Sequence, residues 1–346
     1  MRALKLVSPG TVEIQEVPVP ELGPEDVLVR VGGAGLCHSD LHILHMDETW
    51  PFFGCTVGHE AAGWVDQIGS DVTGLEAGDA VLVSVIWSCG QCRACISGRD
   101  NACAIAGSRT QFPTTPGIAI DGGMAEYLKV KARYLDKIGD LDVVAAAPLA
   151  DAGVTPMHAI NSVRALLTPD ATVVVIGIGG LGHMAVQILA ATSGARIIAV
   201  DADERRAQSA LSIGADLALP SGDAGCAQIL DFTAGYGADV VIDFVGNAQT
   251  VDMARRIVAP EGAIQFVGLG GGTLAFTAGI DGESLPWGVR VQRSYGGTRS
   301  DQLQVIALAQ QGKIAVHTVT YPLSEVKAAF DDLEHGRIAG RAVLIP

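Results

Sequence analysis

The second half of the sequence alternates between continuous apolar segments and helical segments, and this rhythm restricts the fold more than any other feature. From Ala171 onward, helical segments separate strand-like segments with the sequences ATVVVIG, RIIAVDA, ADVVIDFVG and GAIQFVGLG. Apolar strands that alternate with helices predict a parallel sheet covered on both faces. The uncharged stretch 171–195 is also long enough for a membrane span, but its five glycines, His183 and Gln187 favour a buried strand followed by a packed helix.

The first strand-to-helix turn carries the pattern GxGxxG at Gly177, Gly179 and Gly182. In a dinucleotide-binding unit, the first glycine allows a tight turn, the second lets the backbone approach a pyrophosphate, and the third lets the helix pack on the strand. The pyrophosphate then faces the helix N-terminus. Asp201, at the end of the second strand, is suited to bind the adenosine ribose and to repel a 2′-phosphate. The pattern predicts NAD rather than NADP; a packing cluster of glycines with a surface aspartate is the alternative.

Four of the seven cysteines lie in the segment CGQCRACISGRDNAC, at Cys89, Cys92, Cys95 and Cys103. The spacing C-x2-C-x2-C-x7-C allows several thiolates to converge on one zinc ion, at about 2.3 Å each. An iron–sulfur cluster is the competing interpretation, but the ferredoxin run has its fourth cysteine after three residues, followed by proline. Reduced cysteines in a loop are the remaining alternative. We predict a closed structural zinc site.

A second group of metal-ligating residues lies in GLCHSDLH, residues 35–42, and in the GHE segment at residues 58–60. Cys37 and His59 are candidate ligands of a catalytic zinc, which keeps three protein ligands and one open position. The third ligand is expected from a distant segment. Asp151 lies in otherwise apolar sequence, and binding a metal removes the cost of burying an unpaired carboxylate. A buried apolar role for Cys37 and a helix-capping role for Asp151 are the alternatives.

Composition excludes some classes of function. The chain has 346 residues, of which 49% are hydrophobic and 18% charged, as expected for a globular protein with room for two domains. Its net charge of −15 disfavours nucleic acid and anionic membranes as partners. The start, MRALKLVSPG, has no apolar core of signal-peptide length, so we expect a cytoplasmic protein.

The residues before and after the alternating region show a different pattern. Residues up to about 150 are rich in two-residue alternation and glycine turns, which predicts an irregular β domain. The tail contains two predicted helices, 301–311 and 325–335, and the strand RAVLIP, which have no obvious place in the alternating region.

Together, the motifs CHSD at 37–40, GHE at 58–60, the four-cysteine segment and GIGGLG at 177–182 with Asp201 resemble those of zinc-dependent medium-chain alcohol dehydrogenases. The resemblance covers essentially the full chain. It implies an α/β fold in which a doubly wound Rossmann sheet is inserted in a mainly β catalytic domain with a GroES-like barrel. The implied division is 1–152 for the catalytic domain, 153–294 for the NAD-binding domain, and 295–346 for a return segment that completes the catalytic domain.

The resemblance also assigns roles. Cys37, His59 and Asp151 would hold the catalytic zinc, although many relatives have cysteine at the third place. Glu60 would approach the metal during ligand exchange, and Asp40 would orient the zinc histidine. Ser39 would take the proton of the alcohol, and His42 would pass it to solvent. The implied contacts to the cofactor are His38, Ser39, Thr155, Gly177, Gly179, Gly180, Leu181, Gly182, Asp201, Arg206, Val245, Val267, Gly268, Leu269, Tyr295 and Arg341. The expected substrate-pocket walls are Trp50, Phe52, Trp87, Tyr295 and Gly296.

The implied function is hydride transfer between an alcohol, expected to be secondary or aromatic, and NAD, with two zinc ions per chain. Zinc would act as a Lewis acid on the alcohol or ketone oxygen. The family suggests a homodimer or homotetramer. A zinc-free quinone or enoyl reductase of the same superfamily and a non-catalytic dinucleotide-binding protein are the alternatives.

Overall fold

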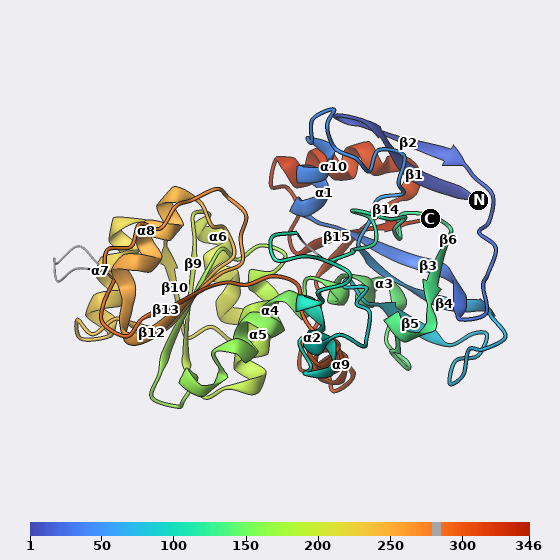
Figure 1. Cartoon of the computed structure of the whole chain (residues 1–346). Helices are drawn as coiled ribbons and strands as arrows, with labels where there is room; N and C mark the ends of the chain where they lie inside the picture. Colours follow the sequence, from blue (N-terminus) through green and yellow to red (C-terminus); the bar gives the residue numbers. More distant parts are fainter. Residues whose placement is uncertain (112, 279–284) are drawn as a thin grey trace. The chain divides into compact units, whose positions relative to one another are not determined.

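The alternating region forms a six-stranded, all-parallel sheet in the computed structural model, which describes residues 1–111, 113–278 and 285–346 (Figure 1). The strand order is β10-β9-β8-β11-β12-β13. Counted from β8, this is the 3-2-1-4-5-6 order of a doubly wound dinucleotide-binding sheet. The strands are β8 Thr172–Ile176, β9 Arg196–Asp201, β10 Leu217–Pro220, β11 Ala238–Asp243, β12 Val258–Phe266 and β13 Arg290–Arg293.

Helices cover both faces of this sheet. Side chains of α7 and α8 pack with Ile176, Val200 and Ile264 in one apolar cluster, while α5 contacts β8 and β9. Each fully buried aliphatic side chain of this kind contributes about 1.5–3 kcal/mol. The helices of this unit are α4 Val154–Ser162, α5 Gly182–Thr192, α6 Glu204–Ser209, α7 Asp223–Phe232 and α8 Ala248–Ile257, with 3₁₀ turns at Arg164–Leu166 and Ala210–Ile213.

The rest of the chain forms a mainly antiparallel β unit that contains both ends of the sequence. Its large sheet has the order β14-β15-β3-β4-β5-β7, with β6 paired to β3, and β1 and β2 form a separate hairpin. The strands are β1 Arg2–Ser8, β2 Thr11–Glu16, β3 Asp26–Leu36, β4 Glu60–Ile68, β5 Ala80–Val83, β6 Tyr127–Lys131, β7 Leu135–Lys137, β14 Thr318–Pro322 and β15 Arg341–Ile345.

The chain divides into two compact units, and one of them is built from two separate segments of the sequence. One comprises Met1–Val154 and Gly296–Pro346, and the other Thr155–Tyr295. β15 pairs with β3, so the tail joins the first sheet. The predicted fold class, a doubly wound parallel sheet inserted in a mainly β unit, is confirmed. The helices of the β unit are α1 His38–Leu44, α2 Arg93–Ile96, α3 Val143–Ala146, α9 Arg299–Gln310 and α10 Val326–Glu334, with 3₁₀ turns at Asp100–Ala102, Ala132–Tyr134, Ala147–Ala150 and Leu323–Glu325.

Local capping explains where several helices begin. Thr298 accepts a hydrogen bond from the Asp301 N–H, and the Asp301 carboxylate accepts one from the Thr298 N–H, so α9 begins in a reciprocal capping box. The Asn247 side chain accepts hydrogen bonds from the N–H groups of Gln249 and Thr250 at the start of α8. These caps satisfy N–H groups that have no partner inside a helix.

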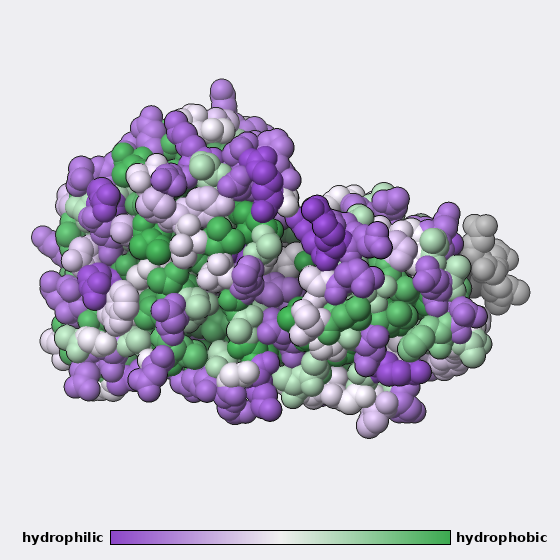
Figure 2. Space-filling model, turned by 180° about the vertical axis from the view of Figure 1, so that it is seen from behind, coloured by the Kyte–Doolittle hydropathy of each residue, from purple (hydrophilic) through white to green (hydrophobic). Residues whose placement is uncertain are grey.

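The uncharged stretch 171–195 forms β8 and α5, as the strand-and-helix interpretation predicts. In the part of the chain that the structure describes, no single helix is long and apolar enough to cross a membrane. Two short helical segments, Val143–Ala150 and Val154–Ser162, together reach the length and apolar composition of a membrane span, but the chain bends between them. On the face drawn in Figure 2, hydrophobic residues are exposed in patches among hydrophilic ones.

Candidate functional site

Three metal-ligating side chains from separate elements converge in the β unit. Cys37 follows β3 and precedes α1, His59 immediately precedes β4, and Asp151 follows the 3₁₀ turn Ala147–Ala150. Oδ2 of Asp151 lies 3.7 Å from Cys37 Sγ and 3.7 Å from His59 Nε2. Ligands about 2.0–2.3 Å from a tetrahedral ion are separated by about 3.3–3.8 Å. The three atoms therefore fit one zinc-sized ion, and a Glu60 oxygen lies within 4.8 Å of them.

Asp40 contacts two of these candidate ligands. Its Oδ2 accepts a hydrogen bond of 2.8 Å from the Cys37 N–H, and its Oδ1 lies 3.3 Å from His59 Nδ1. This contact leaves Nε2 of His59 directed toward the other ligands, which is how an outer carboxylate orients a metal-binding histidine. Burial lowers the pKa of His59, but the Asp40 and Asp151 carboxylates outweigh this effect and raise the pKa well above its usual value.

A buried arginine adjoins the same set. Nε of Arg341, on β15, donates to Glu60 Oε1 and Oε2 at 3.1 and 3.0 Å, and Nη2 also contacts Glu60. Nη2 lies 3.2 Å from Asp151 Oδ2. Burial raises the pKa of Glu60, although the Arg341 guanidinium works in the opposite direction. The structure thus places Arg341 against two carboxylates of the site, a position that the predicted pyrophosphate role did not anticipate.

The proposed proton path begins beside the metal ligands. Ser39 Oγ lies 3.6 Å from Cys37 Sγ. Ser39 and His42 are three residues apart on α1, so they share one face of the helix, and the His42 side chain is exposed. His38 is also exposed. The relay through His42 and the pyrophosphate contact of His38 stay predictions.

Four other cysteines, Cys89, Cys92, Cys95 and Cys103, bring their sulfur atoms together around one point. Sγ of Cys95 lies 3.8 Å from that of Cys89 and 3.5 Å from that of Cys92, and Sγ of Cys103 lies 3.9 Å from that of Cys92. These distances match the edges of a tetrahedron around one zinc ion and are far longer than a disulfide bond of about 2.05 Å. N–H groups of Cys89 and Ala106 each lie 3.3 Å from Cys103 Sγ.

Two of these thiols, Cys92 and Cys95, differ in acidity. N–H groups of the backbone at Cys95 and Ala104 lower the pKa of Cys92 to about 6. Burial raises the pKa of Cys95 to about 12. A cation that holds all four sulfurs must therefore displace protons, as zinc does in closed thiolate sites. The geometry favours one ion over a cluster, because all four sulfurs lie within 4.8 Å of one another.

The glycines of the GxGxxG turn play different steric roles. Gly177 has a φ of +88°, and a Cβ there would lie 2.6 Å from Val245 Cγ2. A Cβ on Gly182 would lie 1.8 Å from the Gly177 carbonyl oxygen. A Cβ on Gly179 would meet no described atom within 4 Å. The turn is thus tight at its ends and open in the middle, as a backbone that admits a pyrophosphate requires.

Asp201 lies beside this turn. Its Oδ2 accepts a 2.7 Å hydrogen bond from the Ile178 N–H, and its Oδ1 accepts one of 2.8 Å from the Asp203 N–H. Each oxygen retains a further lone pair for a ribose hydroxyl. The other predicted cofactor contacts in this unit range from buried to exposed: Thr155, Val267, Gly180, Leu181, Arg206, Val245, Gly268, Tyr295 and Leu269.

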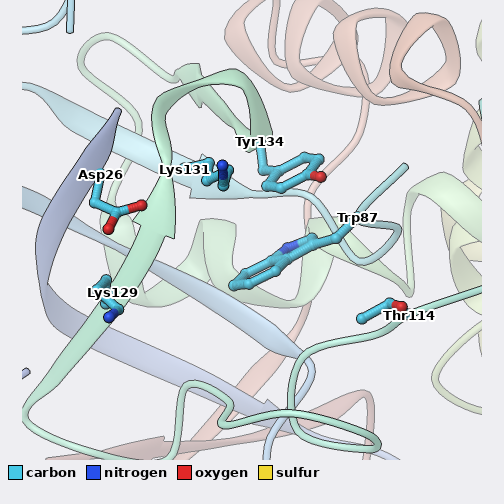
Figure 3. Close-up of a pocket in the computed structure, with 6 residues that line it drawn as sticks. All are labelled: Asp26, Trp87, Thr114, Lys129, Lys131 and Tyr134. Atoms are coloured by element: carbon cyan, nitrogen blue, oxygen red, sulfur yellow. The ribbon is translucent and has the colours of Figure 1, made fainter. Parts of the chain in front are cut away.

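The expected substrate-pocket residues occupy different surroundings. Trp50 and Phe52 form an edge-to-face pair with ring centroids 5.2 Å apart. Trp87 instead stacks on Tyr134 and donates from Nε1 to the Ser84 carbonyl. These two rings line a hollow of about 370 Å³ together with Asp26, Thr114, Lys129 and Lys131. Figure 3 draws the six side chains that line it.

The sequence reasoning missed Ile86 and Gly35. A Cβ on Gly296 would lie 3.2 Å from Ile86 Cδ1, so Ile86, and not Trp87, adjoins Gly296. Gly35 is a strand glycine, and an isolated glycine in a strand indicates a close approach of other atoms. The GLCHSDLH segment contains this signal, since Gly35 of β3 lies opposite Glu60 of β4.

Two family models match the sequence. The alcohol dehydrogenase GroES-like domain matches residues 23–140, and the zinc-binding dehydrogenase model matches residues 180–311. The first covers the part of the β unit that contains Cys37, His59 and the four-cysteine segment, and it ends before Asp151. The second covers most of the parallel-sheet region, from Gly180 in the GxGxxG turn onward.

Individual relatives match over the whole chain. The NAD-dependent alcohol dehydrogenase of Sulfurisphaera tokodaii is 36% identical, with 100% of each chain covered. The D-arabinose 1-dehydrogenase (NADP(+)) of Saccharolobus solfataricus is 35% identical, with 96% of this chain and 94% of the relative covered. The alcohol dehydrogenase structure from Aeropyrum pernix has a TM-score of 0.90 at 34% identity, with full coverage of both chains. The acetophenone reductase structure from Geotrichum candidum, in complex with NAD, has a TM-score of 0.87 at 31% identity, with 100% and 97% covered.

Proposed function

Because the chain belongs to the zinc-binding, medium-chain alcohol dehydrogenase family, we propose that it oxidises alcohols with NAD and reduces the corresponding ketones or aldehydes with NADH in a zinc-dependent reaction. One observation carries the zinc dependence. Sulfur, nitrogen and oxygen atoms of Cys37, His59 and Asp151 converge with the spacing of a zinc site, and the Ser39 hydroxyl lies beside them.

Each residue of the site has a separate role in the proposed reaction. A zinc ion bound at this site would polarise the alcohol or carbonyl oxygen and lower the pKa of the alcohol. Asp40 orients His59 and fixes the Cys37 backbone. Ser39 Oγ would take the proton of the alcohol and give up its own proton, and His42, one helical turn further along α1, would pass that proton toward solvent through the nicotinamide ribose of bound NAD. NAD supplies the hydride acceptor, and the protein supplies its position and the surrounding charge.

We propose NAD as the preferred cofactor because Asp201 places a carboxylate beside the GxGxxG turn. A 2′-phosphate there would meet negative charge and lose the ribose hydrogen bond. The curated relatives named NAD-dependent alcohol dehydrogenases are consistent with this preference, whereas the relative named D-arabinose 1-dehydrogenase carries NADP(+) in its name. The ratio of kcat/KM for NAD and NADP decides between the two.

We propose a secondary or aromatic alcohol as the substrate class. The aromatic pair of Trp50 and Phe52 offers flat apolar surface, and Gly296 takes up little room beside Ile86. The name of the acetophenone reductase with a similar fold indicates a ketone that carries an aromatic ring. The test is a panel of primary, secondary, aromatic and sugar alcohols with NAD, and of their carbonyl products with NADH. Turnover confined to sugars would contradict this substrate class.

Two zinc ions per chain and a homodimer or homotetramer complete the proposal. The closed cysteine set supports the second ion. The edge strand β13 supports self-association, because its four residues are exposed and an open sheet edge invites pairing with another strand. Elemental analysis and sedimentation equilibrium measure these two quantities.

Two other functions make different predictions. A zinc-free quinone or enoyl reductase would retain turnover after removal of the metal from the Cys37 site. A non-catalytic dinucleotide-binding protein would bind NADH but show no turnover with any alcohol, ketone, quinone or enone. The paired Cys37 and His59, and the hydroxyl of Ser39 beside them, favour the dehydrogenase over both.

A further inference from the structure

A carboxyl group is buried at the point where the strand order of the parallel sheet changes direction. From β8 the order runs through β9 to β10 on one side, and from β11 it runs through β12 to β13 on the other. In a sheet of this order, ligands bind outside the carboxyl ends of the strands at this switch point. Asp243 is the last residue of β11 and is 0% exposed. Its side chain therefore lies at the edge of the sheet where the cofactor is expected.

The Asp243 side chain fixes the turn that follows it. Its Oδ1 accepts hydrogen bonds from the Val245 N–H at 2.8 Å and from the Gly246 N–H at 2.9 Å. Its Oδ2 is also buried and has no hydrogen-bond partner among the residues that the structure describes. Burial raises the pKa of Asp243, although the N–H groups of Gly246 and Val245 work in the opposite direction. Oδ1 can accept both bonds whether or not the carboxyl group is ionised.

The Asp243 main chain holds a second loop. Its carbonyl oxygen accepts hydrogen bonds from the Val267 N–H at 2.9 Å and from the Gly268 N–H at 3.0 Å, directly after β12. Asp243 thus makes two hydrogen bonds to each of two loops. Val245, Val267 and Gly268 are among the expected cofactor contacts, whereas Asp243 is not. It therefore holds residues that are expected to touch the cofactor without being one of them.

These loops pack too closely to move independently. A Cβ on Gly268 would lie 2.2 Å from the carbonyl carbon of Val245, and a Cβ on Gly246 would lie 2.3 Å from the Gly268 carbonyl oxygen. On the other side, a Cβ on Gly177 would lie 2.6 Å from Val245 Cγ2. The turn 244–246 therefore lies between the first glycine of the GxGxxG turn and the loop after β12. A displacement of this turn disturbs both of its neighbours.

We propose that Asp243 is a positioning residue for the cofactor, because it fixes the turn 244–246 between the GxGxxG turn and the loop after β12. This inference rests on the proposed binding of NAD at the GxGxxG turn. A binding surface that is already ordered loses less conformational freedom when its ligand binds. Without the Asp243 acceptor, the cofactor must order the turn itself, and its affinity falls.

A purely structural role for Asp243 makes a different prediction. If the carboxyl group only stabilised the sheet, its replacement would lower stability and leave the NADH affinity of the folded protein unchanged. Asp243→Asn retains an oxygen acceptor at Oδ1 but buries an amide N–H₂ group at the position of Oδ2, which has no partner. It should therefore lower the melting temperature and retain the affinity. Asp243→Ala removes the acceptor and should lower both.

The experiment combines NADH titration by fluorescence with thermal unfolding of the full-length proteins. We expect Asp243→Ala to bind NADH about tenfold more weakly or worse, as the loss of two hydrogen bonds from the turn implies, and Asp243→Asn to bind it as tightly as the wild type. Val241→Ala is the matched control, because Val241 is fully buried two residues earlier on the same face of β11. Its cavity should lower the melting temperature and leave the affinity unchanged.

Undiminished affinity in Asp243→Ala, or equal losses of affinity in Asp243→Ala and in either Asp243→Asn or Val241→Ala, would overturn the inference. Hydrogen exchange in the wild type keeps it testable if Asp243→Ala does not fold. The Val245 and Gly246 amides should exchange slowly in the cofactor-free protein, and exchange at the rate of an open loop would overturn the inference. Failure of the proposed cofactor site has a different signature: the wild-type protein would bind no NADH, and the inference would fall with it.

Discussion

Alanine substitutions at Gly179 and Gly182 should have different effects, although both glycines belong to the same turn. Gly182→Ala should lower stability, and Gly179→Ala should weaken cofactor binding. Gly182→Ala puts a Cβ 1.8 Å from the Gly177 carbonyl oxygen, so the start of α5 must move by more than 1 Å or the turn must open. Forced overpacking of this kind costs about 1–3 kcal/mol. For a unit of this size, that cost corresponds to a melting temperature lower by about 3–10 °C.

Gly179→Ala should have the opposite profile. The added Cβ meets no described atom within 4 Å, and Gly179 does not require a positive φ. The loss of backbone freedom in the unfolded chain should leave stability unchanged or raise it by about 0.4–1 kcal/mol. If the open space admits the pyrophosphate, the methyl group obstructs it, and we expect NADH to bind at least about tenfold more weakly, or about 1.4 kcal/mol.

Thermal unfolding by circular dichroism and NADH titration by fluorescence measure these quantities on the same preparations. The account requires that Gly182→Ala loses stability and that Gly179→Ala loses affinity without losing stability. An undiminished affinity in Gly179→Ala would refute the assignment of this turn to the pyrophosphate. A wild-type melting temperature in Gly182→Ala would refute the steric argument.

Three further experiments test the cofactor preference, the proton path and a surface ion pair. Asp201→Gly should narrow the preference for NAD over NADP, measured as the ratio of kcat/KM values, and a wild-type enzyme that prefers NADP would show that this carboxylate was misread. Ser39→Ala should lower kcat for alcohol oxidation by about 10²–10⁴-fold, Ser39→Thr by less, and His42→Ala by at most the lower end with a larger loss at low pH; an unchanged pH profile would remove His42 from the relay. Burial raises the pKa of Asp121, but Lys5 and the Thr56 N–H outweigh burial and lower it, so the pair stabilises the fold above the unfolded-state pKa of about 3.9 and this contribution disappears as the pH falls below it. Lys5→Met should therefore lower the melting temperature at pH 7 and have a smaller effect near pH 3, and an equal effect at both would contradict the assignment.

The sequence predicted the candidate metal-binding residues from their chemistry and the parallel sheet from its apolar pattern. Cys37, His59 and Asp151 were recognisable because each belongs to a residue type that binds zinc, and the family resemblance joined segments that lie 114 residues apart. The parallel sheet was predictable because buried parallel strands have continuous apolar sequence. The four-residue strands β10 and β13 gave too little pattern to identify.

Other features depended on contacts that no local pattern reports. The Arg341–Glu60 pair joins residues 281 positions apart, through the pairing of β15 with β3 and of β3 with β4. Ile86 and Trp87 are adjacent in sequence, but only Ile86 adjoins Gly296, while Trp87 stacks on Tyr134. Which of these two adjacent side chains faces Gly296 depends on the path of the chain after β5, and the local sequence does not report that path.

The most direct test of the central claim measures zinc content and NADH formation together in wild-type protein and in Cys37→Ser. The account predicts two zinc ions per wild-type chain with alcohol-dependent formation of NADH. In folded Cys37→Ser it predicts one zinc ion, retained by Cys89, Cys92, Cys95 and Cys103, normal NADH binding and no turnover. A Cys37→Ser protein that keeps undiminished alcohol oxidation, or a wild-type chain that is active with zinc only at the four-cysteine site, would contradict the claim that Cys37, His59 and Asp151 hold the metal on which catalysis depends.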